Sequence, residues 1–256
     1  MHEFLSTWYG MAIFILIDIA AVIAVLAIGY KFLCKRLLSF LLSTLCLIFT
    51  SPAFLWVYLK YQKYKNAGGE IAGFLRRDPV VGKGGKTVWV TTFETRKEDG
   101  SIADEYGKGL EERAVRTLPR LLDVFWGRAA FVGVSALRFE DAAFLDDEQE
   151  MRYESRIGLI SPLKKEEKKD AREVLDEEAV YAENYHFFID LKIFFGYLIS
   201  KIRGEKQEAW DTAYAKLLYE KEEITKEEYD SVLESAQEET NEWHESRKPV
   251  QKPTEE

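Results

Sequence analysis

Residues 107–133 read GKGLEERAVRTLPRLLDVFWGRAAFVG and carry the most informative pattern of the chain. We expect helix up to Leu118 and Pro119 and helix again after them, because proline lacks a backbone N–H and its ring clashes with the preceding turn. The two residues directly before this interruption are Arg116 and Thr117. The stretch therefore predicts two helices that meet at a proline break, with a cation and a hydroxyl beside the break.

Upstream of this stretch, residues 80–96 read VVGKGGKTVWVTTFETR. Gly84 and Gly85 suit a tight turn, and TVWVTTF is rich in β-branched and aromatic residues, so we expect a β-hairpin. A glycine turn beside lysines can hold phosphate, but the frame GxxxxGK[ST] of phosphate-binding loops is absent. We therefore interpret this turn as a structural one.

The net charge of −9 is unevenly distributed along the chain. It is +4 over residues 1–66, −4 over residues 67–203 and −9 over residues 204–256. This order differs from that of a nucleic-acid binder, which clusters basic charge on its folded domain. Cys34 and Cys46 lie in apolar surroundings without metal-ligand spacing or a disulfide framework, so we expect no metal and no cofactor.

The apolar segment from Trp8 to Tyr30 is long enough to cross a bilayer core of ~30 Å as a helix. It lacks a basic leader region and a small-residue cleavage site, which argues against a cleaved signal peptide. Lys31, Lys35 and Arg36 follow it, and the residues before it contain no Lys or Arg. The positive-inside rule then predicts a periplasmic N-terminus and a cytoplasmic main domain.

Asp18 lies near the middle of this segment, where an ionisable side chain costs roughly 2.5–3.5 kcal/mol on insertion scales. Two interpretations stay open. Asp18 contacts a helix of another membrane protein, or it is protonated and hydrogen-bonded within its own chain.

A second apolar segment, Leu37 to Tyr58, is interrupted by Ser51 and Pro52, where a helix should bend or break. Basic residues stand at both of its ends, the later ones being Lys60, Lys63 and Lys65. A helix that enters the membrane, bends and returns keeps both clusters cytoplasmic, and the Ser51 hydroxyl can satisfy backbone groups that the proline frees. An ordinary two-helix hairpin is the alternative.

The frame TLPRLLDVFWG, followed by Val132-Gly133, closely resembles the segment that carries the catalytic Asp-Glu pair of the bacterial sugar transferases. The resemblance to these monotopic phosphoglycosyl transferases covers residues 34–203. It includes KRLLSFLLSTLCLIFTSPAFLWVYLK, which is similar to their re-entrant helix, and YAENYHFFIDLKIFF, which is similar to their closing motif. The family transfers a sugar phosphate from a nucleotide sugar to polyprenyl phosphate with an Asp nucleophile and Mg²⁺. The resemblance thus implies the bacterial inner membrane and surface-polysaccharide or glycoconjugate biosynthesis.

The chain departs from the family pattern at positions where the family carries charged residues of its active site. Arg116 and Thr117 stand in place of the Asp-Glu pair, and Ser135 stands in place of the arginine of Pro-Arg-Pro. Glu111 replaces an arginine, and Glu94 replaces the arginine of a Lys-Phe-Arg-Thr-Met segment. An arginine has no nucleophilic carboxylate and repels a divalent cation, so these departures argue against the family's chemistry.

Other parts of the family pattern are retained. The matching residues are Arg156, Gly158, Tyr181, Glu183, Asn184, Asp190, Leu191, Lys192 and Ile193. His186 replaces a serine and is interpreted as a surface or packing residue. The implied fold is α+β and membrane-associated. It comprises a transmembrane helix (1–33), a Ser-Pro-broken re-entrant helix (34–66) and a mostly helical cytoplasmic domain with a small β-hairpin (67–203).

Residues 204–256 lie beyond the resemblance and form an acidic tail. KLLYEKEEITKEEYDSVLES predicts two short helices joined at Ile224 and Thr225, and Thr225 with Glu228 forms a capping box. Such hairpins are found at the ends of bacterial proteins, where they serve oligomerisation. A solvated acidic helix pair with a disordered end is the other interpretation.

Three hypotheses for function follow. The first is a non-catalytic pseudoenzyme that binds or regulates an active sugar transferase as a homo- or hetero-oligomer, with Asp18 as a contact. The second is an active enzyme that uses relocated carboxylates, Glu94, Glu111 or Glu112, and then requires Mg²⁺. The third is a module that holds polyprenyl phosphate through Lys35 and Arg36, because basic residues at the interface attract anionic head groups.

Overall fold

The computed structural model describes residues 7–30, 34–71, 73–97, 101–112, 115–162, 170–203 and 213–246. The elements follow one another as α2 (Trp8–Gly29), α3 (Lys35–Asn66), β1 (Leu75–Val81), η2 (Lys83–Gly85), β2 (Thr87–Phe93), α4 (Asp104–Glu112), α5 (Arg120–Phe125), β3 (Ala130–Val132), α6 (Phe139–Ala142), η3 (Gln149–Glu154), β4 (Gly158–Ile160), α7 (Ala171–Asn184), α8 (Phe187–Ile202), α9 (Tyr214–Glu220) and α10 (Lys226–Glu245). The fold is mixed, mainly helical, with two small two-stranded sheets.

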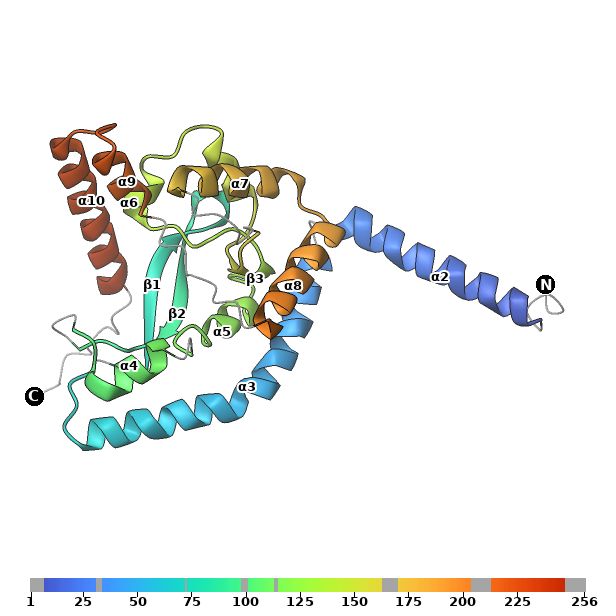
Figure 1. Ribbon diagram of the computed structural model, residues 1–256, viewed down its shortest axis with the longest axis horizontal. Coiled ribbons are helices and arrows are strands. Elements are labelled where there is room, and N and C mark those ends of the chain that lie inside the picture. Colours follow the sequence, from blue (N-terminus) through green and yellow to red (C-terminus); the bar gives the residue numbers. More distant parts are fainter. Residues whose placement is uncertain are drawn as a thin grey trace, which may run out of the picture.

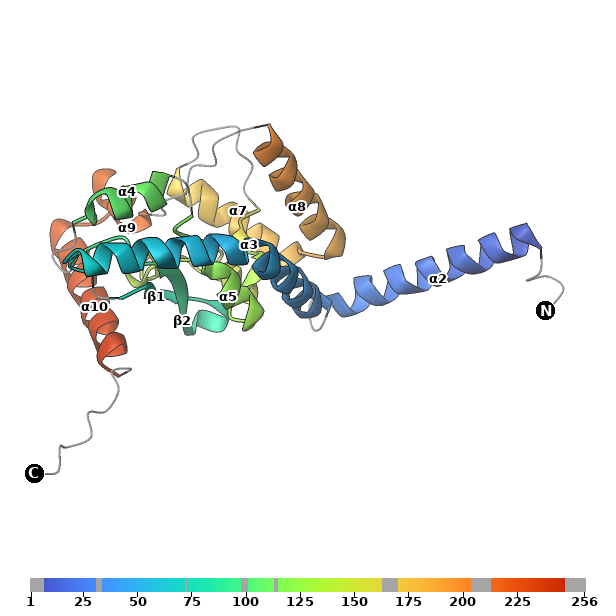
Figure 2. The same cartoon turned by 90° about the horizontal axis from the view of Figure 1, so that it is seen from below.

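Helix α2 projects away from the rest of the molecule, as both views agree (Figures 1 and 2). It has 22 residues, and at 1.5 Å per residue it is about 33 Å long. The Thr7 hydroxyl accepts a hydrogen bond from Gly10 N at 3.3 Å and so caps its start. Every side chain from Met11 to Val22 is exposed, so this apolar surface has no cover within the described chain.

Helix α3 is one continuous helix of 32 residues that contains Pro52 and bends in its middle (Figure 1). Pro52 has no N–H to give to the carbonyl of Ile48, four residues earlier. The Ser51 hydroxyl donates to that carbonyl at 2.8 Å, which confirms the role expected for Ser51. Among the described residues, α3 alone is long and apolar enough to cross a membrane, and Trp8–Val22 is a shorter apolar stretch.

Both halves of α3 pack on the same globular part, and the helix runs across one face of it (Figure 2). In the first half, the Phe40 and Phe125 rings lie 5.0 Å apart, and Phe131 N donates to the Ser39 hydroxyl at 3.3 Å. The second half buries Val57 in a cluster of apolar residues beside β2 and α4; its other fully buried members are Tyr61, Phe93, Ala103, Tyr106 and Leu110.

The predicted β-hairpin is confirmed. Strands β1 and β2 are antiparallel from Leu75↔Phe93 at the open end to Val81↔Thr87 beside the turn. The turn is η2, in which Gly84 has a φ of 69°, a conformation that glycine adopts without strain.

The structure also contains a small parallel sheet of β3 and β4 that was not predicted. A Cβ on Gly133 would lie 2.2 Å from the Arg156 carbonyl oxygen, so the close approach of these two chain segments requires glycine there. Three-residue strands are too short to show an alternating pattern, which is why the sequence did not indicate them.

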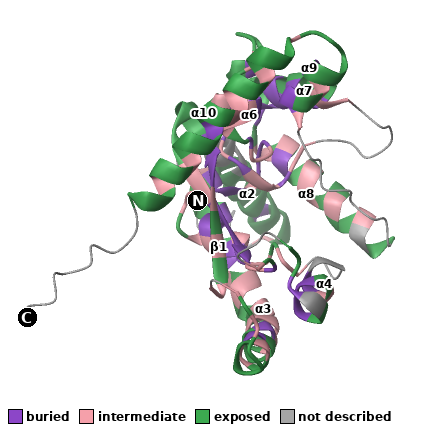
Figure 3. Ribbon diagram, turned by 90° about the vertical axis from the view of Figure 1, so that its left-hand side faces the viewer, coloured by how far each residue is buried: buried purple, intermediate pink, exposed green. Residues whose placement is uncertain are grey.

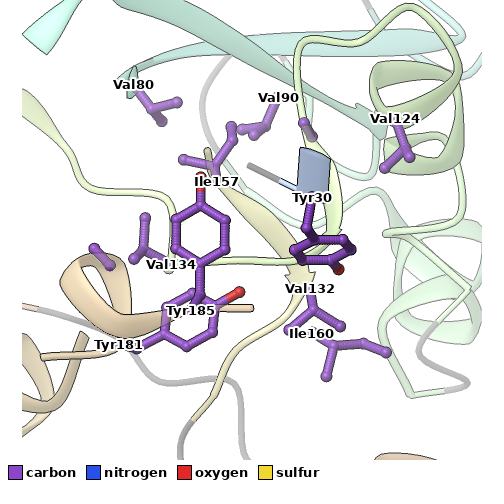
Figure 4. Packing of buried hydrophobic residues seen from close by; sticks show 12 residues of the cluster. Tyr30, Val80, Val90, Val124, Val132, Val134, Ile157, Ile160, Tyr181 and Tyr185 are labelled. Atoms are coloured by element: carbon purple, nitrogen blue, oxygen red, sulfur yellow. The ribbon is translucent and has the colours of Figure 1, made fainter. Parts of the chain in front are cut away.

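The predicted second helix is confirmed as α5, which Pro119 directly precedes. The prediction of helix up to Leu118 is wrong, because α4 ends at Glu112 and residues 116–119 form turns. The main core lies between β1–β2, the β3–β4 pair, α5 and α7 (Figure 4). It includes Val80 and Val90 from the hairpin, Val132 and Ile160 from the parallel pair, and Tyr181 from α7.

The tail forms the two predicted helices, α9 and α10, and the capping box of Thr225 and Glu228 is present. The interpretation as a fully solvated pair is wrong for α9, because Tyr214 and Leu218 are buried against Leu137 and Leu175. Helix α10 keeps an exposed outer face (Figure 3). The predicted disordered end, residues 247–256, lies outside the described residues.

Candidate functional site

Arg116 and Thr117, which the sequence resemblance aligns with the family's catalytic acids, lie between α4 and α5, at the open end of the β-hairpin. Phe93 N, at the end of β2, donates to the Arg116 carbonyl at 2.9 Å, and this bond holds the segment against the sheet. Arg116 is half-buried and Thr117 is exposed. The structure thus presents a guanidinium and a hydroxyl where the family pattern has two carboxylates.

The candidate replacement acids do not form a described carboxylate pair. The Glu94 carboxylate turns back on its own backbone, where Oε1 accepts from Thr95 N and from Arg96 N, each at 3.0 Å. Glu111 and Glu112 lie in the last turn of α4, but their side chains are outside the described part. Within the described ranges, no group of three His, Cys, Asp or Glu side chains is placed to hold a metal ion.

Ser135, at the position of a family arginine, belongs to a buried polar cluster. Its backbone N–H donates to Glu178 Oε1 at 2.6 Å and its hydroxyl to Glu178 Oε2 at 3.0 Å. Arg152 Nη2 lies 2.6 Å from Glu178 Oε2, and both side chains are almost fully buried. A buried ion pair is tolerated only when further hydrogen bonds satisfy it, and here Ser161 adds a fourth bond at 3.2 Å.

Sequence reasoning missed this cluster, although one signal was present. Glu178 occupies the apolar stripe of α7 together with Val174, Leu175, Ala179 and Ala182, which are all buried. A charged residue at the centre of an apolar helix face indicates a buried partner. Because the Arg152–Glu178 pair is buried and the cluster joins α7, η3 and the segment after β3, we interpret its role as structural.

A second polar network joins the start of α3 to α7 and α8. Lys35 Nζ lies 2.9 Å from Asp190 Oδ2 and 2.9 Å from the Tyr181 hydroxyl. The hydroxyls of Tyr30 and Tyr181 donate to the two Asp190 oxygens, each at 2.6 Å. Burial and the Asp190 charge raise the pKa of Tyr181, so its hydroxyl stays a donor.

This network forms the floor of a pocket of about 320 Å³ between the first half of α3, β3 and α8. Its walls are almost wholly apolar, with Leu41 and Leu45 from α3 and Phe194 from α8. The charges of Lys35 and Asp190 offset each other at the floor. The pocket is therefore suited to an uncharged apolar chain rather than to a phosphate group.

The residues predicted to hold a lipid phosphate are adjacent but differ in environment. Lys35 is buried and paired with Asp190, whereas Arg36 is exposed and lies over Gly127, whose added Cβ would be 3.3 Å from Arg36 Nε. Asp18 is exposed on α2, away from both. His186 is exposed, which confirms its interpretation as a surface residue.

Fold and site together define a mixed, mainly helical protein. The bent apolar helix α3 packs against one face of a small domain that contains two two-stranded sheets. The model of the bacterial sugar transferase family matches residues 30–204, more than half of the chain. The chain therefore belongs to the bacterial sugar transferase family. A search of curated proteins gave no match. The apolar N-terminal region and this membrane-associated family together indicate that the protein is associated with a membrane.

Proposed function

We propose that this chain is a non-catalytic member of the family, which binds or regulates an active sugar transferase at the cytoplasmic face of the bacterial inner membrane. The observation that carries the proposal is the pair Arg116 and Thr117, held at the catalytic positions by the bond from Phe93. The pathway implied by the family is the biosynthesis of a surface polysaccharide or glycoconjugate.

The chemistry of these two side chains supports the loss of activity. A guanidinium is protonated at all accessible pH values and is neither a nucleophile nor a ligand for Mg²⁺. A hydroxyl needs an adjacent base to act as a nucleophile, and the sequence around Thr117 offers no activating base. The Glu94 carboxylate is already bonded to its own backbone.

The geometry of α3 favours a re-entrant helix over a crossing one. Its first residue, Lys35, pairs with Asp190, and its second half packs Val57 and Tyr61 beside β2. A helix that crossed the bilayer would have its two ends on opposite sides and could not contact one domain with both. With α2 as a true crossing, this arrangement gives a periplasmic N-terminus and a cytoplasmic domain.

The exposed surface of α2 supports a partner within the membrane. Asp18 is at mid-helix with no cover from its own described chain, and an intramembrane carboxyl usually faces a partner or a cavity. We assign this face to a helix of the active transferase that donates a hydrogen bond to Asp18.

Two experiments test the proposal. Purified full chain is assayed with nucleotide sugars and polyprenyl phosphate beside a family enzyme that has its Asp-Glu pair, and turnover by this chain contradicts the non-catalytic role.

Tagged wild type, Asp18→Asn and Asp18→Leu are then recovered from native membranes, and bound proteins are identified by mass spectrometry. We expect the active transferase with wild type and Asp18→Asn but not with Asp18→Leu. Recovery of the chain with itself alone rejects the hetero-oligomer.

A further inference from the structure

Helix α8 exposes a stripe of large apolar side chains along its outer face. The members recur every three or four residues, which is the spacing of one helix face. The stripe consists of Phe188, Leu191, Phe195, Leu198, Ile199 and Ile202, which are between 37% and 80% exposed. The opposite face of α8 packs on the main core through Ile189, Ile193 and Tyr197. Within the described residues, the stripe is therefore an apolar surface without cover.

The length of α8 limits how it can meet a membrane. Single exposed apolar residues are normal on a protein surface, but a continuous stripe marks contact with a partner or a membrane. Helix α8 has 16 residues, and at 1.5 Å per residue it is about 24 Å long. This is shorter than the hydrocarbon core of ~30 Å, so α8 does not cross it. A membrane contact of this helix has to lie in the plane of the interface.

The start of α8 is fixed where α2 and α3 join, as both views agree (Figures 1 and 2). Asp190, in the first turn of α8, accepts a hydrogen bond from the Tyr30 hydroxyl at the end of α2, at 2.6 Å. It also lies 2.9 Å from Nζ of Lys35, the first residue of α3. The Tyr30 and Phe187 rings are 5.7 Å apart. Because the proposed crossing by α2 ends at Tyr30, these contacts hold the start of α8 at the depth of the membrane surface.

The stripe continues into the apolar surface of α3. Leu191 of α8 lines the same pocket as Leu41 and Leu45 of α3. All three leucines are also exposed outside the pocket. A bilayer that covers the first half of α3 therefore meets the stripe of α8 as well.

Cations stand at the edge of the stripe. Lys192 follows Phe188 by one helical turn, and Arg203 directly follows the end of α8; both are exposed. Long cationic side chains beside an apolar face are typical of helices that lie in a membrane interface, because their charged ends reach the head-group region. These cations and the continuity with α3 favour lipid over a protein as the cover of the stripe.

We propose that the outer stripe of α8 lies in the boundary between head groups and acyl chains of the bilayer, beside α3. The domain then rests on the membrane through α3 and α8, and α2 adds a crossing. This goes beyond the proposed function, since it requires the membrane association of the chain but neither the loss of catalysis nor a partner transferase.

The test places one environment-sensitive fluorophore on the full chain in phosphatidylcholine vesicles, after replacement of the two native cysteines. Phe195→Cys puts the fluorophore in the middle of the stripe. Val180→Cys is the matched control, because Val180 is 62% exposed on α7, where Glu177 and Glu183 are exposed near it. Each labelled chain is measured in vesicles with and without bromine on the acyl chains, which quenches a fluorophore among them.

We expect bromine to remove at least about half of the emission at position 195 and little at position 180, because an interfacial helix buries its apolar face ~5–10 Å into the boundary. Absence of quenching at position 195, or equal quenching at both positions, overturns the proposal. Blue-shifted emission at position 195 without quenching also overturns it. The vesicles hold this chain alone, so that result would place a second copy over the stripe.

A second position keeps the test decisive where Phe195→Cys does not fold, as judged by size exclusion in detergent. Ile202→Cys, at the end of the stripe and 80% exposed in the native chain, should be quenched in the same way. Its emission unchanged by bromine would reject the interfacial position of α8. The measurement contains no sugar substrate and no other protein, so its failure leaves the proposed function standing, and turnover by the chain leaves the position of α8 unaffected.

Discussion

Two of the positions at which this chain departs from the family pattern have different surroundings in the structure. Arg116 and Thr117 stand where the family pattern has its catalytic acids, and Phe93 N bonds to the Arg116 carbonyl rather than to its side chain. In contrast, Ser135 is built into the buried cluster of Arg152 and Glu178. The first pair carries the proposed loss of catalysis, whereas Ser135 belongs to the buried contacts between α7 and η3.

Glu178 provides the first prediction. Glu178→Gln keeps the size of the side chain but leaves the buried Arg152 guanidinium without its counter-charge, which typically costs 3–5 kcal/mol. Denaturant unfolding in detergent measures the change in the free energy of unfolding. Glu177→Gln, one residue earlier and exposed, is the matched control with an expected change of about 0.5 kcal/mol or less. Similar effects for both variants would contradict a buried pair.

Asp141 gives a prediction about pH. It is buried, it accepts a hydrogen bond from Ala215 N at 3.0 Å, and burial raises its pKa from 3.8 to about 6. A carboxyl whose folded pKa is raised stabilises the fold at low pH and loses that contribution as pH rises from about 4 through 6. The loss is at most about 3 kcal/mol at neutral pH.

Asp141→Asn tests the direction in which stability changes with pH. Asparagine keeps an oxygen that accepts from Ala215 N but carries no charge. The free energy of unfolding, measured between pH 4 and 8, should fall with rising pH more steeply in wild type than in Asp141→Asn. A variant that is less stable than wild type at pH 7.5 would show that the charged carboxylate is the favoured form.

At the scale of elements, α3 illustrates how a proline produces a bend without ending a helix. Pro52→Ala restores a donor for the Ile48 carbonyl, which Ser51 now satisfies, and should straighten the helix. With Cys34 and Cys46 replaced, a cysteine at position 63 should react only from the cytoplasmic side in the bent protein. In the Pro52→Ala variant, a fraction should react from the periplasm. Ser51→Ala retains the proline and serves as the control.

Helix α9 contacts the domain through apolar packing and through a surface ion pair. We expect the packing to contribute more to the free energy of unfolding. Leu218 is buried against Leu137 and Leu175, and Leu218→Ala should cost about 2–5 kcal/mol. Lys221, in contrast, pairs with Asp170 on the surface, where both side chains are at least a third exposed. Lys221→Ala should cost less than about 1 kcal/mol. Hydrogen exchange of α9 amides reports both effects, and the reverse order would refute apolar attachment.

At the scale of the whole molecule, the apolar surfaces and the charge distribution together predict an orientation in the membrane. The exposed apolar helix α2 and the bent α3 need a membrane, and the cations near Lys35 favour the cytoplasmic side. With native cysteines replaced, a cysteine at Thr7 should be labelled from the periplasm by a membrane-impermeant reagent. A cysteine at Ser246 should be labelled only after lysis. Labelling of both residues in intact cells would reject a single crossing.

Local features of this chain were predictable because their causes act within a few residues. The proline break before α5, the glycine turn of the hairpin, the Ser51 bond across Pro52 and the capping box of α10 all follow from neighbouring side chains and backbone. The family was also recognisable, since its motifs are contiguous and the matched residues 30–204 agree with the region of resemblance.

Only the tertiary structure decided which charged residues meet. Tyr30 and Asp190 form a hydrogen bond although they are 160 residues apart. The sequence suggested Lys35 as a cation at the membrane interface, but in the structure Lys35 is buried and bonded to Asp190 and Tyr181. Likewise, nothing in the local pattern places α9 on the domain. Periodicity tells which face of an element is buried but not against what, because long-range pairing depends on how the elements pack.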